Sequence, residues 1–214
     1  MPARKPATRL CLVTPPVVDP ATFPATLKSA LAAGDVATLF ITGDGSPAST
    51  QRIAEVLAPV AQSAGVAAIV LNDTRLLGRA NADGVHIDSG VTDLASALER
   101  FRGKKIVGAG GVRSRHEAMQ AGEREPDYLF FGKLDGDSAD TIFPKALDLA
   151  SWWSGLFEIP AVVMGGHAVA SAIEAAEAHI EFVALRTAVW DHPEGPAVAI
   201  AEANRILAGE VPAW

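Results

Sequence analysis

Two adjacent glycines, Gly165 and Gly166, directly follow a short apolar run. Glycine leaves backbone N–H groups uncovered, and uncovered N–H groups ahead of a helix can bind phosphate. Arg186 and Thr187 follow the next apolar run and offer a positive charge and a hydroxyl group to the same anion. We therefore predict a phosphate site formed by these four residues. The alternative is that the glycines serve only a strand-to-helix turn.

Two aspartates follow neighbouring apolar runs and have the chemistry of metal ligands. Asp73 comes shortly after the run 66–71, and Asp88 comes directly after the run 84–87. Mg²⁺ prefers carboxylate oxygens and takes further ligands from substrate phosphates. We expect Asp73 and Asp88 to share a Mg²⁺ ion. The alternative for Asp73 is that its side chain caps the short helix after it.

Two further side chains are candidates for catalysis. Lys133 emerges just after the apolar run 128–131. It can neutralise a phosphate group, or act as a base if burial lowers its pKa from about 10.4. His86 lies inside the run 84–87, where a hydrogen-bonded core histidine is the alternative to a catalytic one. The predicted catalytic residues are Lys133 and His86.

The candidate residues all lie in or after short apolar runs that alternate with amphipathic stretches. Continuously apolar runs of this length are typical of parallel strands covered on both faces. Eight of them, each followed by a helix or a short helical segment, predict the α/β class and a closed (β/α)8 TIM barrel. An open doubly wound sheet fits less well, because the "TPP" after the first run lacks the glycine-rich fingerprint of that fold. The expected strands are 10–13, 36–41, 66–71, 84–87, 105–108, 128–131, 161–164 and 182–185, and the expected helices are 21–33, 48–64, a helix of at most two turns before 84, 93–101, 114–122, 144–155, 168–178 and 195–208.

A closed barrel would gather the candidate residues in one place. Ligand sites of such barrels form at the C-terminal ends of the strands, and the connections after strands seven and eight often hold a phosphate. No linker divides the sequence, so we predict one barrel domain over 1–214, with 1–8 as a flexible N-terminal extension.

Composition excludes several classes of partner. The 214 residues are 49% hydrophobic, which suits one domain with a large core, and the net charge of -7 disfavours nucleic-acid binding. We find no signal peptide and no membrane span, so the expected location is cytoplasmic.

Cys11 is the only cysteine, which rules out a disulfide within the chain. Trp152 and Trp153 on one expected helix indicate internal packing or a contact between copies of a homo-oligomer.

Three segments carry a resemblance to a known family. "LNDTRLLGRANADGVHIDSG", "PDYLFFGK" and "IPAVVMGGHAV" are similar, in this order and at comparable spacings, to segments of the thiamine phosphate synthase family, and the similarity spans roughly residues 8 to 208. The resemblance implies a (β/α)8 barrel that binds small phosphorylated heterocycles. Synthase members join a pyrimidine methyl diphosphate to a thiazole phosphate with Mg²⁺ and release diphosphate. Related members isomerise the thiazole phosphate, using a histidine after the sixth strand.

The resemblance transfers to this sequence only in part. Asp73 matches the family's metal-binding aspartate, and Gly165, Gly166 and the region of Thr187 match its thiazole phosphate site. The basic residues that follow the second strand in the synthases are missing from "LFITGDG", and Asp88 would replace the second metal ligand. A diphosphate leaving group carries about three negative charges and needs compensating cations.

Three functions therefore stay open from the sequence. The first is a thiamine phosphate synthase-like transferase. The second is a thiazole phosphate isomerase that uses Lys133, which stands where the isomerases carry their histidine, for proton transfer. The third is a non-catalytic barrel that binds a phosphate ligand and has lost the diphosphate site.

Overall fold

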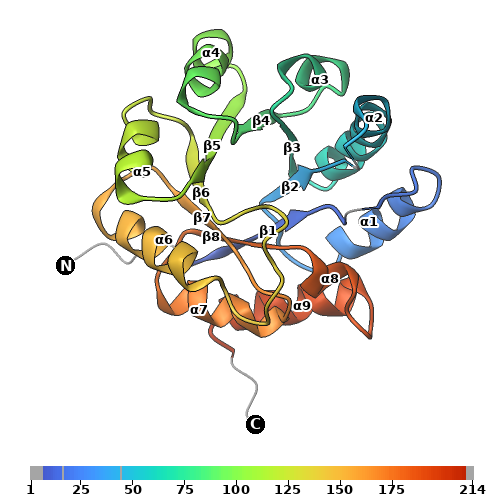
Figure 1. The fold of residues 1–214 in the computed structure, drawn as a ribbon. Helices are drawn as coiled ribbons and strands as arrows, with labels where there is room; N and C mark the ends of the chain where they lie inside the picture. The colour runs from blue at the N-terminus through green and yellow to red at the C-terminus, as the bar shows by residue number, and fades with distance from the viewer. Residues whose placement is uncertain (1–6, 16, 44, 211–214) are drawn as a thin grey trace.

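The computed structural model describes residues 7–15, 17–43 and 45–210. Within these residues, eight parallel strands close into a barrel in the order of the sequence, because the first strand pairs with the last (Figure 1). The predicted (β/α)8 fold is confirmed. The strands are β1 (Arg9–Val13), β2 (Thr38–Ile41), β3 (Ala67–Leu71), β4 (Gly84–Ile87), β5 (Ile106–Val112), β6 (Tyr128–Phe131), β7 (Ala161–Met164) and β8 (Phe182–Leu185).

Helices surround the barrel and cover the outer face of its strands (Figure 1). No helix in the described part of the chain is long and apolar enough to cross a lipid bilayer. The α-helices are α1 (Phe23–Leu31), α2 (Pro47–Ser63), α3 (Thr74–Arg79), α4 (Val91–Phe101), α5 (Arg115–Gly122), α6 (Pro144–Leu156), α7 (Ala172–Glu177), α8 (Thr187–Trp190) and α9 (Pro196–Leu207), and a 3-10 turn η1 (Val169–Ser171) precedes α7.

Two separate apolar clusters explain why the strands read as continuous apolar runs. Successive side chains of a strand point to opposite faces, so Leu10 and Leu12 of β1 pack in the larger cluster against the helices, whereas Cys11 and Val13 belong to the smaller one inside the barrel. Both faces of the strands are therefore shielded from water by apolar side chains. The interior cluster consists of Cys11, Val13, Phe40, Ile69, Tyr128, Phe130, Leu134, Val162, Met164 and Ala184.

The structure corrects three expectations about element bounds. β5 continues to Val112 instead of ending at 108, and its register against β6 shifts between Ala109 and Val112, where Gly111 has a φ of 71°. The expected helix 168–178 is divided into η1 and α7, and the short helix α8 after β8 was not predicted. Because β5 is longer, the residue that follows it, Arg113, reaches the mouth of the barrel.

The predicted N-terminal extension lies partly outside the described residues, which begin at Ala7. Thr8, expected to be flexible, is buried, and its hydroxyl group donates a hydrogen bond to the carbonyl of Ile180 at 2.7 Å. The first strand is thus fixed from its beginning against the segment that leads into β8.

Candidate active site

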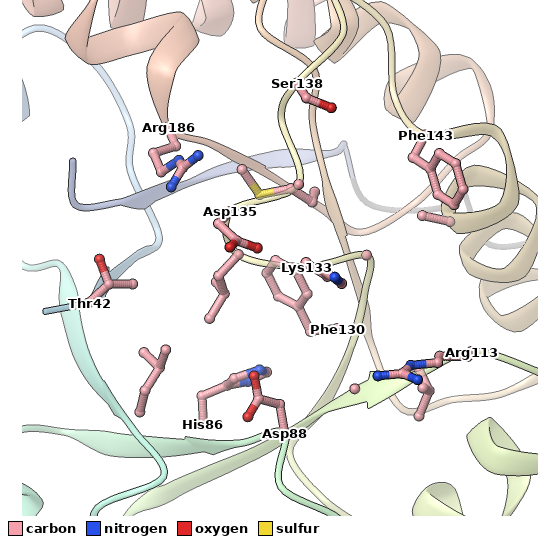
Figure 2. A pocket seen from close by; sticks show the side chains of 18 of the residues that line it. Thr42, His86, Asp88, Arg113, Phe130, Lys133, Asp135, Ser138, Phe143 and Arg186 are labelled. Atoms are coloured by element: carbon pink, nitrogen blue, oxygen red, sulfur yellow. The ribbon is translucent and has the colours of Figure 1, made fainter. Parts of the chain in front are cut away.

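A cavity of about 1050 Å³ opens at the C-terminal ends of the strands (Figure 2). Four of the predicted site residues line it: His86 from β4, Asp88 after β4, Lys133 after β6 and Arg186 after β8. The other four, Asp73, Gly165, Gly166 and Thr187, are not among the lining residues. The structure therefore brings half of the predicted set together at one mouth.

His86 lies at the base of this cavity and is only 1% exposed. Its Nδ1 is 3.0 Å from the hydroxyl oxygen of Tyr128, and the two rings are stacked. Burial lowers the pKa of His86 from 6.5 to about 4, although the charge of Asp88 opposes the shift. The imidazole is therefore neutral near pH 7, as expected for a hydrogen-bonded core histidine that also faces the cavity.

Glycines of β5 make room for this pair of rings. A Cβ atom at Gly108 would lie 1.8 Å from Cζ of Tyr128, and one at Gly110 would lie 2.5 Å from Nε2 of His86. Real Cβ atoms do not approach other atoms so closely, so any side chain at these positions must displace a ring. The glycine-rich part of β5 thus sets the position of His86.

The two predicted metal ligands have different surroundings. Asp73 caps α3, because its Oδ1 accepts hydrogen bonds from the N–H groups of Arg75 at 2.8 Å and Leu76 at 3.0 Å. Asp88 pairs with Asn72, which donates from Nδ2 to Oδ1 at 2.7 Å and accepts from the Asp88 N–H at 3.0 Å. The capping alternative for Asp73 is confirmed.

These two carboxylates still fit a hard cation in their donor chemistry. Oδ2 of Asp73 and Oδ2 of Asp88 accept no hydrogen bond from the residues that the structure describes. No group of three or more His, Cys, Asp or Glu side chains suited to a metal occurs among those residues. Mg²⁺ is commonly bound by one or two carboxylates together with water and substrate phosphates, and the unpaired oxygen of each aspartate is a donor of this kind.

Positive side chains line one side of the cavity. Arg113 after β5 and Lys133 after β6 lie on the same side of the mouth, whereas Arg186 lies on the other (Figure 2). Lys145, in the first turn of α6, lines the cavity as well. Within the described ranges, Arg113, Lys133 and Lys145 have no ion pair. Three cations are therefore directed to the mouth without a carboxylate partner.

Arg113 and Lys145 are site residues that were not predicted from the sequence. Arg113 stands in the "AGGVRS" stretch after the expected fifth strand, so its place at a strand end was a usable signal. Its backbone N–H donates to Oε2 of Glu117 at 2.6 Å, and Ser114 accepts from the Glu117 N–H, so these side chains cap the start of α5 beside Arg113. The signal for Lys145 is weaker: a cation in the first turn of a helix opposes the helix dipole.

The predicted phosphate residues Arg186 and Thr187 both contact a carboxylate of the protein itself. Arg186 donates to Oδ1 of Asp137 from Nε at 3.0 Å and from Nη2 at 2.5 Å. Thr187 donates to Oδ2 from its N–H at 2.9 Å and also from its hydroxyl group. Burial by itself raises the pKa of Asp137, but the hydrogen bonds from Arg186 and Thr187 outweigh it and hold the pKa below its ordinary value. Asp137 is therefore an anion.

The prediction that Gly165 and Gly166 expose their N–H groups is wrong. The Gly165 N–H donates to the carbonyl of Ala184 at 2.8 Å, and the Gly166 N–H donates to Oγ of Ser171 at 2.9 Å. Close packing is the reason for both glycines. A Cβ atom would lie 2.4 Å from a methyl carbon of Leu185 at the first position and 2.3 Å from the carbonyl oxygen of Asp140 at the second.

The fold and the mouth define a class: a (β/α)8 barrel with a cation-lined cavity at the C-terminal ends of its strands. The family model described as thiamine monophosphate synthase matches residues 10–189. The chain belongs to this family, as the three segments predicted.

Individual relatives agree with the family over nearly the whole chain. The thiamine-phosphate synthase of Rhodospirillum centenum is 38% identical over 205 residues, which cover 94% of this chain and 98% of the relative. That of Hyphomonas neptunium is 34% identical over 210 residues and 95% of each chain. The solved thiamine phosphate pyrophosphorylase of Pyrococcus furiosus superimposes with a TM-score of 0.75 over 95% of this chain and 97% of that chain, at 22% identity.

Proposed function

We propose that this protein is a thiamine phosphate synthase, a transferase that condenses a hydroxymethylpyrimidine diphosphate with a thiazole phosphate and releases diphosphate. The observation that carries the proposal is the cavity of about 1050 Å³ lined by three cations without carboxylate partners among the described residues. Its volume lies slightly above the usual range of about 300–1,000 Å³ for small-molecule sites, which suits two substrates bound together. The synthases named above are similar to this chain over nearly its full length.

Arg113, Lys133 and Lys145 are the proposed diphosphate site. Ionisation of the pyrimidine diphosphate transfers negative charge to the leaving group, and fixed cations in a partly enclosed site stabilise that charge more than water does. These residues supply the positive charge that the segment after β2 lacks. Ionisation breaks the C–O bond to diphosphate, and the thiazole nitrogen then forms a C–N bond with the methylene carbon of the pyrimidine cation.

Asp73 and Asp88 are the proposed ligands of Mg²⁺. Bound there, the ion would neutralise part of the diphosphate charge and orient the leaving group. Asp88 lines the cavity and is held by Asn72, so its free oxygen has a defined place at the mouth. Asp73 would have to bind the ion while it caps α3.

The base of the cavity is the proposed seat of the heterocycles. Phe130 and Met164 line it beside His86, and Phe130 contacts the imidazole edge to face. A neutral His86 can exchange a hydrogen bond with a ring nitrogen or an amino group but adds no positive charge. We therefore assign His86 to substrate orientation and Lys133 to charge stabilisation.

The condensation itself is the test. The purified protein, Mg²⁺ and the two substrates should yield thiamine phosphate and diphosphate in equal amounts. Arg113→Ala should lower this rate, and Arg205→Ala, which removes an exposed arginine of α9 far from the mouth, should not. A wild-type protein that forms no product above background would reject the synthase function.

Two outcomes of the same assay would favour the alternatives. Isomerisation of the thiazole phosphate without condensation, abolished by Lys133→Ala, would indicate the isomerase. Binding of thiazole phosphate without turnover of either kind would indicate the non-catalytic barrel.

A further inference from the structure

We propose that Asp137 is a specificity-determining residue: its carboxylate is an internal ligand that occupies the phosphate-binding groups of Arg186 and Thr187 until a phosphorylated substrate displaces it. The inference rests on the proposed function in so far as it concerns the thiazole phosphate. It goes further because it names the competitor and the class of substrate that can replace it.

The donors around Asp137 are of the kind that bind an oxyanion. Two guanidinium N–H groups of Arg186, one backbone N–H and one hydroxyl group of Thr187 all donate to one carboxylate. The Asp137 side chain is 0% exposed and that of Arg186 is 16% exposed. Carboxylate and phosphate oxygens bind the same charged donors with similar geometry. A phosphate group could therefore use this set of donors only by displacing the carboxylate.

The segment that carries Asp137 also lies against Gly166 and His167. This segment is the connection between β6 and α6, residues 132–143. The His167 N–H donates to the carbonyl of Ala139 at 2.6 Å, and the carbonyl of Asp140 covers Gly166. Movement of this connection would free Arg186 and Thr187 and expose the Cα side of Gly166, while the Gly166 N–H stays bonded to Ser171.

The same connection also lines the cavity. Lys133, Asp135 and Ser138 face the mouth (Figure 2), and Asp137 lies between them in the sequence but points away, into the donors. Displacement of Asp137 by a phosphate would therefore shift side chains that contact the other substrate. Binding of a phosphate to Arg186 and Thr187 would therefore change the binding of the other substrate on the opposite side of the mouth.

Selection follows from this arrangement. A ligand must bind Arg186 and Thr187 more strongly than the tethered carboxylate does, which a phosphate dianion can do and a neutral hydroxyl group cannot. The site would thus take the phosphorylated thiazole and reject the unphosphorylated thiazole alcohol. The internal competitor also weakens phosphate binding. The apparent dissociation constant is the intrinsic one divided by the fraction of molecules in which the donors are free.

The direct test is the affinity for inorganic phosphate and for thiazole phosphate by calorimetry. Asp137→Asn keeps the shape and one acceptor oxygen but removes the competing charge. We expect its dissociation constants for both ligands to fall about tenfold or more, in proportion to the population of free donors. Asp140→Asn, an exposed residue of the same connection, removes the same charge without touching Arg186 and should bind as the wild type does. Equal or weaker binding by Asp137→Asn would overturn the proposal.

A second measurement needs no variant and covers the case in which Asp137→Asn does not fold. Hydrogen exchange of the wild-type protein is followed with and without saturating phosphate. Displacement predicts faster exchange at the His167 N–H, bonded to Ala139, and at the Ile142 N–H, bonded to Glu174. Unchanged or slower exchange there, or no phosphate binding by either protein, contradicts it. Neither measurement involves condensation. A failure of the synthase assay therefore does not affect the test of Asp137, and a failure of that test does not affect the synthase assay.

Discussion

Two sides of one barrel mouth differ in what their cations contact. On the β8 side, Arg186 is bonded to a buried aspartate, and the nearby glycine N–H groups are bonded within the protein. On the β5 and β6 side, Arg113, Lys133 and Lys145 face the cavity without an ion pair among the described residues. Residue types alone would predict an anion site on the first side. The structure indicates that the second side can accept an anion directly, whereas the first must release one of its own groups.

The largest expected effect is the loss of activity on the open side. Lys133→Ala should lower the rate of condensation about a hundredfold or more, which is the usual cost of removing one group that stabilises developing negative charge. Lys133→Arg should keep most of the rate, because it keeps the charge. Steady-state kinetics with both substrates provide the measurement. An arginine variant as inactive as the alanine variant would instead indicate proton transfer by Lys133.

A large loss of stability should result from opening the occupied side. Arg186→Gln leaves the carboxylate of Asp137 buried without its cation, which costs about 3–5 kcal/mol. Urea unfolding at pH 7 measures the free energy of unfolding of the variant and of the wild type. Lys133→Gln, which removes a cation from the open side, should change it by about 0.5 kcal/mol or less. If the two variants lost similar free energies of unfolding, the cations on the two sides of the mouth would not differ as described.

The pH dependence of stability should follow from His86 at the base between the two sides. Its pKa is about 4 in the folded protein against an ordinary value of 6.5, so the unfolded chain takes up a proton first as the pH falls. Stability should therefore be full above pH 6.5, decline as the pH falls from 6.5 to about 4, and show no further loss from this group below that. Urea midpoints measured across this pH range for the wild type and for His86→Gln give the contribution of His86 to stability. The same dependence of the midpoint on pH in both proteins would contradict the prediction.

The smallest expected effect separates the two roles of Asp73. Asp73→Ala should destabilise the protein by about 1 kcal/mol through the loss of the α3 cap, and Asp73→Ser should restore most of it, because serine is also a good cap. If Asp73 also binds Mg²⁺, both variants should need more Mg²⁺ for half-maximal activity. A serine variant with normal stability and normal Mg²⁺ dependence would leave Asp73 as a cap only.

The sequence predicted the barrel well because both faces of its strands are buried. The bounds of the fourth, sixth, seventh and eighth strands agree with the structure, since the last three are continuous apolar runs and the fourth is interrupted only by His86. β5 was predicted too short because Gly110 and Gly111 interrupt its apolar run, although the His86 ring requires glycine at the first position and the Asp88 carbonyl requires it at the second.

The contacts of the site were harder to predict than its residues. The position of Arg186 after a strand was visible in the sequence, but its partner Asp137 is 49 residues away. The carboxylate belongs to a connection without regular structure, where neither periodicity nor turn chemistry indicates which side chain will be buried. Packing between strands likewise bonds the Gly165 N–H to the carbonyl of Ala184, so the sequence could not show that this N–H group is already paired.

The most direct test of the open side is the binding of diphosphate. Calorimetric titration of inorganic diphosphate in the presence of Mg²⁺ should show binding to the wild-type protein and to the control Arg205→Ala. The double variant Arg113→Ala/Lys145→Ala should bind at least about tenfold more weakly, because two charge-assisted contacts are lost. Diphosphate binding that is unchanged in the double variant would contradict the assignment of this side of the mouth.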